Sequence, residues 1–176
     1  MTKELELELT FLASPRLVTH SLLEGVDMVD VYIPSNTSVV HPRLRLRQQA
    51  DRYTVTKKIP VSSDDASAHT EETICLTLDE FECLSAASGR RVAKTRYKCD
   101  LGGRIAEVDV FKESLAGLVL IDFEFANSSE LLDFTPPPEC LADVTQEEFI
   151  AGGVLAGKSY NDISPQLERF NYEPVR

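Results

Sequence analysis

Strict alternation of polar and apolar residues begins near the amino terminus. Between Glu4 and Phe11, a Glu or Thr at every second position alternates with Leu or Phe. This period of two predicts a β-strand with one polar and one apolar face. Strand patterns of this or lesser regularity also occur at 26–33, 43–47, 52–59, 72–77, 92–99, 105–111 and 118–125. The chain is therefore predicted to be mainly β, with about eight strands.

Helix signals occur in three places between and after these segments. An N-cap residue before apolar residues at helical spacing, or a glycine after them, marks a helix boundary. We expect helices from Ser14-Pro15 to Gly25, over 79–88 with Thr77 or Asp79 as N-cap and Gly89 at the end, and from the Thr145 and Glu148 capping box onwards. These helices would cover the apolar face of the sheet, giving an α+β arrangement.

A single domain over residues 1–176 is the expected organisation, because this length suits one hydrophobic core. Residues 62–69 are small and acidic, which is typical of a flexible loop. The prolines at 136–138 are expected to end the sheet region. The chain end after about residue 164 is expected to be loose.

Composition restricts the class of protein. Apolar residues make up 43% and charged residues 27% of the chain, which predicts a folded protein. The formal net charge of −11 argues against binding to duplex nucleic acid or to an anionic membrane. The amino terminus lacks the apolar core of a signal peptide, and the four cysteines lack Cys-x-x-Cys spacing. We therefore expect a cytoplasmic protein, monomeric or homodimeric, with reduced cysteines.

The charges are sorted along the chain rather than mixed. Residues 36–58 contain six cations and one anion, a local charge of +5 in a chain whose remainder is −16. A solvated sheet face normally mixes both signs, because like charges on neighbouring strands repel. Ordinary salt bridges on a wet face are the alternative for any single strand. Sorting over six strands instead predicts a charged ligand.

Two kinds of charged row are expected on the polar face of the sheet. Arg and Lys rows bind phosphate oxygens, and carboxylates at two-residue spacing offer oxygen ligands to Mg²⁺ or Mn²⁺. Closing the strands into a barrel would turn this face into a lumen. The cationic rows are Arg43, Arg45 and Arg47; Arg52 and Lys58; and Lys94, Arg96 and Lys98, whereas the acidic rows are Glu4, Glu6 and Glu8; Glu107 and Asp109; and Asp122 and Glu124.

Seven short motifs, taken in order, resemble the CYTH or triphosphate tunnel metalloenzyme family. They are Glu6-Leu-Glu8, Leu44-Arg-Leu-Arg47, Arg52-Tyr-x-x-Thr56-x-Lys58, Lys94-Thr-Arg96-Tyr97, Glu107-Val-Asp109-x-Phe111, Leu115-Ala-Gly117-Leu118 and Asp122-Phe-Glu124. The resemblance covers about residues 3–160. It implies a closed eight-stranded antiparallel β-barrel that binds a linear triphosphate and a divalent metal, Mg²⁺ or Mn²⁺.

The resemblance also implies roles for particular residues. Glu6, Glu8, Glu72 and Lys94 are expected to take part in catalysis. The expected metal ligands are Glu6, Glu8, Glu107, Asp109, Asp122 and Glu124. The expected substrate-binding residues are Arg45, Arg47, Arg52, Lys58, Lys94 and Arg96.

Two departures from the family pattern concern the reaction. Thr10 stands where the family usually has a lysine, and a hydroxyl brings no charge. Asp122 stands where the family usually has a glutamate, one methylene longer. Triphosphate and metal binding should tolerate both changes, whereas catalysis depends on them more directly.

Hydrolysis of the terminal phosphoryl group of a triphosphate is the function that the resemblance favours. Inorganic tripolyphosphate is the first candidate substrate, because the short chain shows no separate module that would bind a nucleobase. The alternatives are a non-catalytic triphosphate- or polyphosphate-binding protein, suggested by Thr10, and class IV adenylate cyclase or thiamine-triphosphatase activity. A purely structural acidic barrel is a further alternative.

Overall fold

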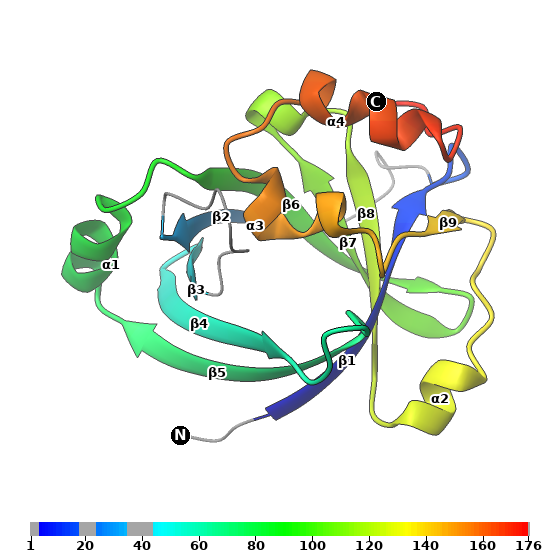
Figure 1. Cartoon of the computed structure of the whole chain (residues 1–176), viewed down its shortest axis with the longest axis horizontal. Helices are drawn as coiled ribbons and strands as arrows, with labels where there is room; N and C mark the ends of the chain where they lie inside the picture. The colour runs from blue at the N-terminus through cyan, green and yellow to red at the C-terminus, as the bar shows by residue number, and fades with distance from the viewer. Residues whose placement is uncertain (1–3, 18–23, 35–43, 176) are drawn as a thin grey trace.

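One antiparallel sheet closes on itself to form the body of the protein. The computed structural model describes residues 4–17, 24–34 and 44–175. Its strands are β1 (Glu4–Ala13), β2 (Val26–Ile33), β3 (Leu44–Gln49), β4 (Arg52–Pro60), β5 (Ala68–Leu76), β6 (Arg91–Leu101), β7 (Arg104–Phe111), β8 (Val119–Phe125) and β9 (Cys140–Asp143). The order is β5-β4-β3-β2-β6-β7-β8-β1-β9, and β1 also pairs with β5 (Figure 1). The predicted closed eight-stranded antiparallel barrel is confirmed.

Strand β1 closes the barrel because it is long enough to pair with three strands. Its first half pairs with β5, most of its length pairs with β8, and its last residues pair with β9. The ninth strand was not predicted, since its four residues show no alternation. The prolines at 136–138 therefore do not end the sheet, because the chain returns to it directly afterwards.

The alternation along β1 separates the lumen from the outer wall. Leu7 and Phe11 pack outside the barrel against Phe123, beneath helix α2 (Ser128–Leu132) and Phe134. The ring centroids of Phe123 and Phe134 lie 4.7 Å apart. Glu6, Glu8 and Thr10, at the alternate positions of β1, face the opposite way, into the lumen.

Toward one end of the barrel, the inward positions change from charged to apolar. Leu12 follows Thr10 on the inner face of β1, and Leu120 precedes Asp122 on β8. Both side chains pack in one buried cluster with Leu155 of the carboxyl-terminal segment. We call this cluster the apolar floor; it contains Leu12, Tyr32, Val92, Phe111, Leu120, Phe149, Ile150, Leu155, Ile163 and Leu167. The charged part of the lumen is therefore bounded at this end.

The helices agree with the sequence prediction only in part. Helix α1 (Leu78–Ser85) has Thr77 as its N-cap and Glu80 as the partner in a capping box, and it ends at Ala86. Asp79 and Gly89 are therefore not its boundaries. The predicted helix after Ser14 lies mostly outside the described residues, since only 14–17 precede the undescribed segment.

The carboxyl-terminal segment forms short helices rather than one long helix. They are η3 (Glu148–Ile150), α3 (Gly152–Leu155) and α4 (Tyr160–Glu168), whereas a further short helix, η2 (Glu113–Leu115), connects β7 and β8. Thr145 does not cap a helix, because its hydroxyl donates to Asp143 and accepts from the backbone N–H of Thr10. No helix in the described part of the chain is long and apolar enough to cross a membrane.

The chain end is packed rather than loose. Residue 164 lies inside α4, and the buried Tyr172 hydroxyl bridges two backbone groups. It accepts a hydrogen bond from the N–H of Val119 at 2.8 Å and donates one to the carbonyl of Gly117 at 2.9 Å. The expectation of a loose end is therefore wrong, because Ile163 and Leu167, one helical turn apart on α4, are buried in the same cluster as Tyr172.

We predict that Gly152→Ala destabilises the protein. Gly152 begins α3, and a Cβ at this position would overlap the hydroxyl oxygen of Tyr32. Relieving such an overlap in a packed core typically costs about 1–3 kcal/mol of the free energy of unfolding. Urea denaturation would measure the change.

Gly89→Ala is the matched control, because nothing lies within 4 Å of a Cβ there. Its stability should be unchanged or raised by at most about 1 kcal/mol. Equal stability of both variants would contradict the close approach of α3 to Tyr32.

Candidate active site

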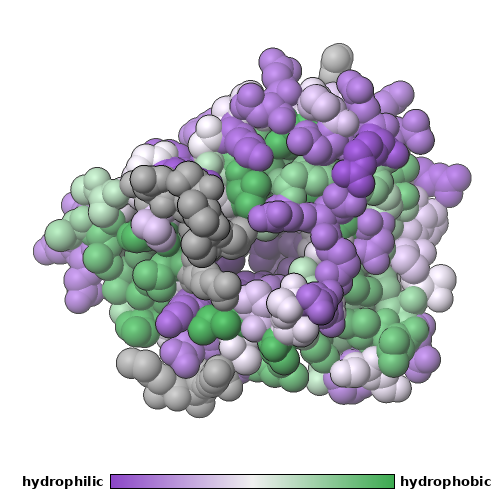
Figure 2. Space-filling model, viewed as in Figure 1, coloured by the Kyte–Doolittle hydropathy of each residue, from purple (hydrophilic) through white to green (hydrophobic). Residues whose placement is uncertain are grey.

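The lumen gathers charged side chains from all eight strands of the barrel. Figure 2 shows a hollow near the centre of the molecule in this view, with hydrophilic residues around it. The cations come from β3, β4 and β6, and the carboxylates come from β1, β2, β5, β7 and β8. Some of these charged groups neutralise one another and others have no counter-charge. The groups without a counter-charge indicate which ligands the site can bind.

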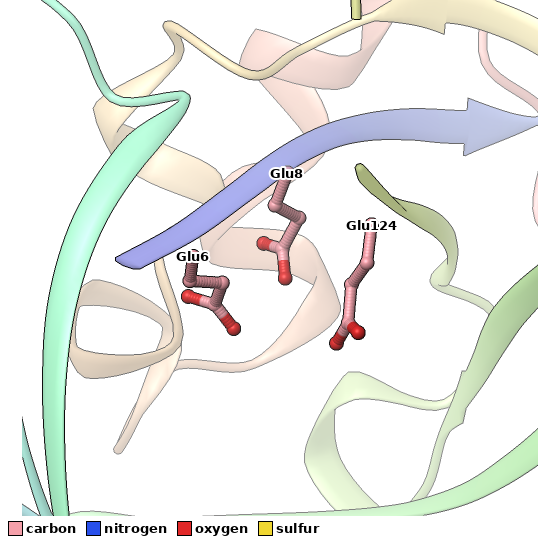
Figure 3. Close-up of side chains that lie close together, drawn as sticks. All are labelled: Glu6, Glu8 and Glu124. Carbon is pink, nitrogen blue, oxygen red and sulfur yellow. The ribbon is translucent and has the colours of Figure 1, made fainter. Parts of the chain in front are cut away.

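Three glutamates, Glu6, Glu8 and Glu124, lie close together and form what we call the acidic cluster. One carboxylate oxygen each of Glu6, Glu8 and Glu124 lies within 4.8 Å of the other two. Figure 3 shows the three side chains pointing into the same space from β1 and β8. Glu124 is exposed, yet partial desolvation raises the pKa of its carboxyl group, and the nearby Glu107, Glu6 and Glu8 raise it further. Repelling carboxylates held this close are suited to a hard divalent cation.

Asp122 lies beside the acidic cluster but outside its group of close oxygens. Its carboxylate accepts a hydrogen bond of 2.8 Å from the hydroxyl of Thr10, its partner in the β1–β8 register. Burial, followed by the charges of Glu8 and Asp109, raises the pKa of Asp122 to about 8. The two departures from the family pattern are therefore in direct contact with each other.

Glu107 and Asp109, expected as metal ligands, instead neutralise the cations of β6. Arg96 donates to Asp109 through Nε and Nη2, both at 2.6 Å, and it also pairs with Glu107. Lys94 pairs with Asp109 as well. Burial by itself would raise the pKa of Asp109, but Lys94 and Arg96 outweigh burial and lower it. The β6–β7 register causes this, because it sets Arg96 directly opposite Asp109.

A carboxylate that the sequence analysis missed holds Arg47. Asp30 on β2 accepts from Nε of Arg47 at 2.7 Å and from Nη2 at 2.8 Å. The Asp30 side chain is 2% exposed, and its pKa lies far below its usual range because Arg47 and Arg45 outweigh burial. The signal was present, since Asp30 interrupts an apolar strand at an inward position, between Met28 and Tyr32.

Arg45 differs from the other expected phosphate-binding residues. Its Nε is buried and has no hydrogen-bond partner within the part of the chain that the structure describes. It lies opposite Tyr32 of β2 and Thr56 of β4, neither of which is charged at neutral pH. A buried guanidinium nitrogen without a partner favours an anionic ligand.

Lys58 lies next to the acidic cluster and beside Glu71, not beside Glu72. Its ammonium pairs with Glu6 and lies 4.0 Å from Glu8 and 3.7 Å from Glu71. Glu71 is the register partner of Lys58, whereas Glu72 is the partner of Lys57, which faces the outer wall. The catalytic role expected for Glu72 is therefore wrong, because alternation turns its side chain out of the lumen.

Two other expected residues do not join these groups. Arg52 is exposed at the first position of β4 and forms no ion pair with any described residue. Arg43 lies outside the described residues. The structure therefore brings together Glu6, Glu8, Arg45, Arg47, Lys58, Lys94, Arg96, Glu107, Asp109, Asp122 and Glu124 in one lumen.

Comparison with known proteins finds a clear relative. The chain is 35% identical over 136 residues to the inorganic triphosphatase of Nitrosomonas europaea, and the match covers 76% of this chain and 86% of the relative. No family model matches the chain.

Solved structures agree with this similarity. A crystal structure of an inorganic triphosphatase is 33% identical, with a TM-score of 0.61, and the match covers 86% of this chain and 93% of that one. A Bacillus halodurans protein described as a candidate adenylate cyclase is 17% identical, with a TM-score of 0.57 over 94% of this chain and 98% of its own. The second likeness concerns the fold alone.

We predict that Asp30→Asn destabilises the protein by about 3–5 kcal/mol, because it leaves Arg47 buried without its counter-charge. The depressed pKa of Asp30 contributes stability that is present above the unfolded pKa of about 3.9 and decreases as pH falls below it. The difference in the free energy of unfolding between wild type and variant should therefore be smaller at pH 3 than at pH 7, by about 1 kcal/mol. Urea denaturation at both pH values measures it.

Asp27→Asn on the same strand is the control. The Asp27 side chain is 76% exposed, and its ion pair with Lys112 lies at the surface. Its removal should change stability by less than about 1 kcal/mol. A similar loss in both variants would argue against a special role for the buried pair.

Proposed function

The chain belongs to the inorganic triphosphatase family, and on that premise we propose that it hydrolyses the terminal phosphoryl group of a linear triphosphate. Inorganic tripolyphosphate is the first candidate substrate. One observation carries the proposal: a closed barrel holds both an acidic cluster of Glu6, Glu8 and Glu124 and a cationic wall, which we define as Arg45, Arg47, Lys94 and Arg96. This is the arrangement expected of a triphosphate tunnel metalloenzyme of the CYTH type.

The acidic cluster fits a divalent metal. Its three carboxylates offer oxygen ligands, and the raised pKa of Glu124 reflects both partial desolvation and negative charge that the neighbouring Lys98 does not offset. We propose Mg²⁺ or Mn²⁺ as the ion, held by Glu6, Glu8 and Glu124. When bound, the ion would polarise phosphate oxygens and reduce the repulsion between substrate and carboxylates.

The cationic wall would bind and orient the phosphates. Arg45 supplies a buried nitrogen that lacks a partner among the described residues, and Asp30 fixes Arg47 in one orientation before the substrate arrives. Lys94 and Arg96 are oriented by Asp109 in the same way. Donors held in place in a partly dry lumen stabilise developing charge without having to reorganise. The wall would therefore lower the barrier as well as bind substrate.

A triphosphate-binding protein without catalytic activity is the second candidate, and Thr10 favours it. The hydroxyl of Thr10 is engaged with Asp122 and brings no positive charge to the metal side of the lumen. Such a protein would bind tripolyphosphate and metal tightly and release no phosphate. Thiamine-triphosphatase and cyclase activities are further outcomes of the same assay.

The testing experiment is phosphate release from tripolyphosphate, ATP, GTP and thiamine triphosphate, each with Mg²⁺ and Mn²⁺. We expect metal-dependent release that is fastest with tripolyphosphate. Glu124→Gln should lower turnover by on the order of a hundredfold at limiting metal, equivalent to about 2.7 kcal/mol. Glu72→Gln should leave turnover unchanged, because Glu72 faces outward. Tight binding with no release from any substrate would refute hydrolysis.

We also predict that Thr10→Lys raises turnover. A lysine there would bring positive charge beside Asp122 and Glu8, where the wild type has a hydroxyl. If the new contact forms mainly in the transition state, the gain is on the order of tenfold. Steady-state kinetics would measure it. A variant that binds tripolyphosphate but stays inactive would favour the binding-protein alternative.

A further inference from the structure

The ammonium of Lys58 and the acidic cluster share two carboxylates. Lys58 pairs with Glu6 and lies 4.0 Å from Glu8, and both glutamates belong to the group whose oxygens approach one another within 4.8 Å. Among the described residues, no other lysine or arginine forms an ion pair with Glu6 or Glu8. In the wild-type chain, Lys58 is therefore the lysine that neutralises two of the three carboxylates of the cluster, those of Glu6 and Glu8.

The role of Lys58 as the counter-charge of Glu6 and Glu8 depends on the residue at position 10. A lysine on β1, the usual residue of the family pattern, would bring a second cation near Asp122 and Glu8. Thr10 brings none, so neutralisation of Glu6 and Glu8 falls to Lys58. The Lys58 side chain is only 29% exposed, and in such surroundings opposite charges interact more strongly than in water.

A divalent ion and the Lys58 ammonium cannot both use Glu6 fully. Two cations held a few ångströms apart repel each other, and the repulsion is strong where solvent screening is weak. Lys58 has another carboxylate partner in Glu71, 3.7 Å away on β5. It also follows Thr56, which faces Arg45, along the inner face of β4. Lys58 therefore lies between the acidic cluster and the cationic wall.

We propose that Lys58 exchanges partners between the two ligands of the lumen. Without a divalent ion it neutralises Glu6 and Glu8, and when an ion binds these glutamates Lys58 is released to the triphosphate. The two ligands therefore bind cooperatively, each favouring the other. This inference rests on the proposed function and adds to it the residue that couples metal to substrate.

The other cations of the lumen make this release important. Arg47 is paired with Asp30, and Lys94 and Arg96 are paired with Asp109. A triphosphate that enters the lumen alone would meet Arg45 as its one cation without a carboxylate partner among the described lumen residues. Release of Lys58 adds a second one. Coupling of this kind is reciprocal, so it must appear in the metal affinity as well.

The test measures Mn²⁺ affinity by titration calorimetry and by the electron paramagnetic resonance signal of free Mn²⁺. Without triphosphate, Lys58→Met should bind Mn²⁺ about 3–10-fold more tightly than wild type, because the competing ammonium is gone. Lys57→Met is the matched control, since Lys57 is the adjacent lysine and faces the outer wall. It should bind Mn²⁺ as wild type does.

The same titrations at saturating imidotriphosphate, a non-hydrolysable triphosphate, give the distinguishing result. In the wild type Lys58 would then contact phosphate, so the advantage of Lys58→Met should disappear. If Lys58→Met still binds Mn²⁺ more tightly than wild type by the same factor at saturating imidotriphosphate, Lys58 acts only as a fixed charge. That result would overturn the exchange. Unchanged or weaker Mn²⁺ binding by Lys58→Met without the analogue would overturn it as well.

Glu124→Gln separates failure of this inference from failure of the proposed site. If Glu124→Gln binds Mn²⁺ as tightly as wild type, the acidic cluster is not the metal site and the proposed function loses its basis. If Glu124→Gln weakens Mn²⁺ binding while Lys58→Met leaves it unchanged, only the exchange is refuted. Lys58→Gln repeats the measurement with a polar side chain, so a folding defect of Lys58→Met does not decide the outcome.

Discussion

Pairing of β1 with both β5 and β8 is the interaction on which the rest of the molecule depends. It joins the first strand of the chain to the last strand of the β2–β5 region and to the last strand of the β6–β8 region. An open sheet would expose two edges and leave its charged face in water. Closure removes the edges and confines the charges in a narrow lumen, where electrostatic interactions are stronger and more selective than at a surface.

Confinement makes pairing of charges obligatory for most residues of the lumen. A buried charge without a partner costs several kcal/mol, so Arg47, Lys94 and Arg96 each have a carboxylate from a neighbouring strand. The exceptions are informative for that reason. Arg45 has no partner for its buried Nε among the described residues, and the cluster around Glu124 gathers like charges. The unpartnered nitrogen of Arg45 suits an anionic ligand, and the gathered carboxylates suit a cation.

Thr10 and Asp122 form a linked departure from the pattern that the sequence resembles. Both side chains are shorter than the usual lysine and glutamate, and a hydrogen bond of 2.8 Å joins them. With no lysine on β1, Lys58 on β4 becomes the cation closest to Glu6 and Glu8. In this chain Lys58, rather than a lysine on β1, therefore neutralises two carboxylates of the acidic cluster. On the proposed exchange, this substitution of one cation for another couples metal binding to substrate binding.

The sequence by itself determined which residues of most strands face inward, because alternation is a local property of an extended backbone. For this reason the period of two alone assigns Glu6, Glu8, Arg45, Arg47, Lys94, Arg96 and Glu124 to one polar face. Only the tertiary structure decided the partners. Cross-strand register made Asp109 a counter-ion of Lys94 and Arg96 rather than a member of the acidic cluster.

Register also decided where the sequence pattern was ambiguous. Adjacent Glu71 and Glu72 give no alternation of charge, so the inward residue follows from the pairing of β5 with β4. Asp30 was missed because only its inward position distinguishes it from Asp27 on the same strand, and β9 was missed because a four-residue strand carries too little periodicity. Their roles depend on neighbours far away in the chain, and distance in sequence is information that no local pattern contains.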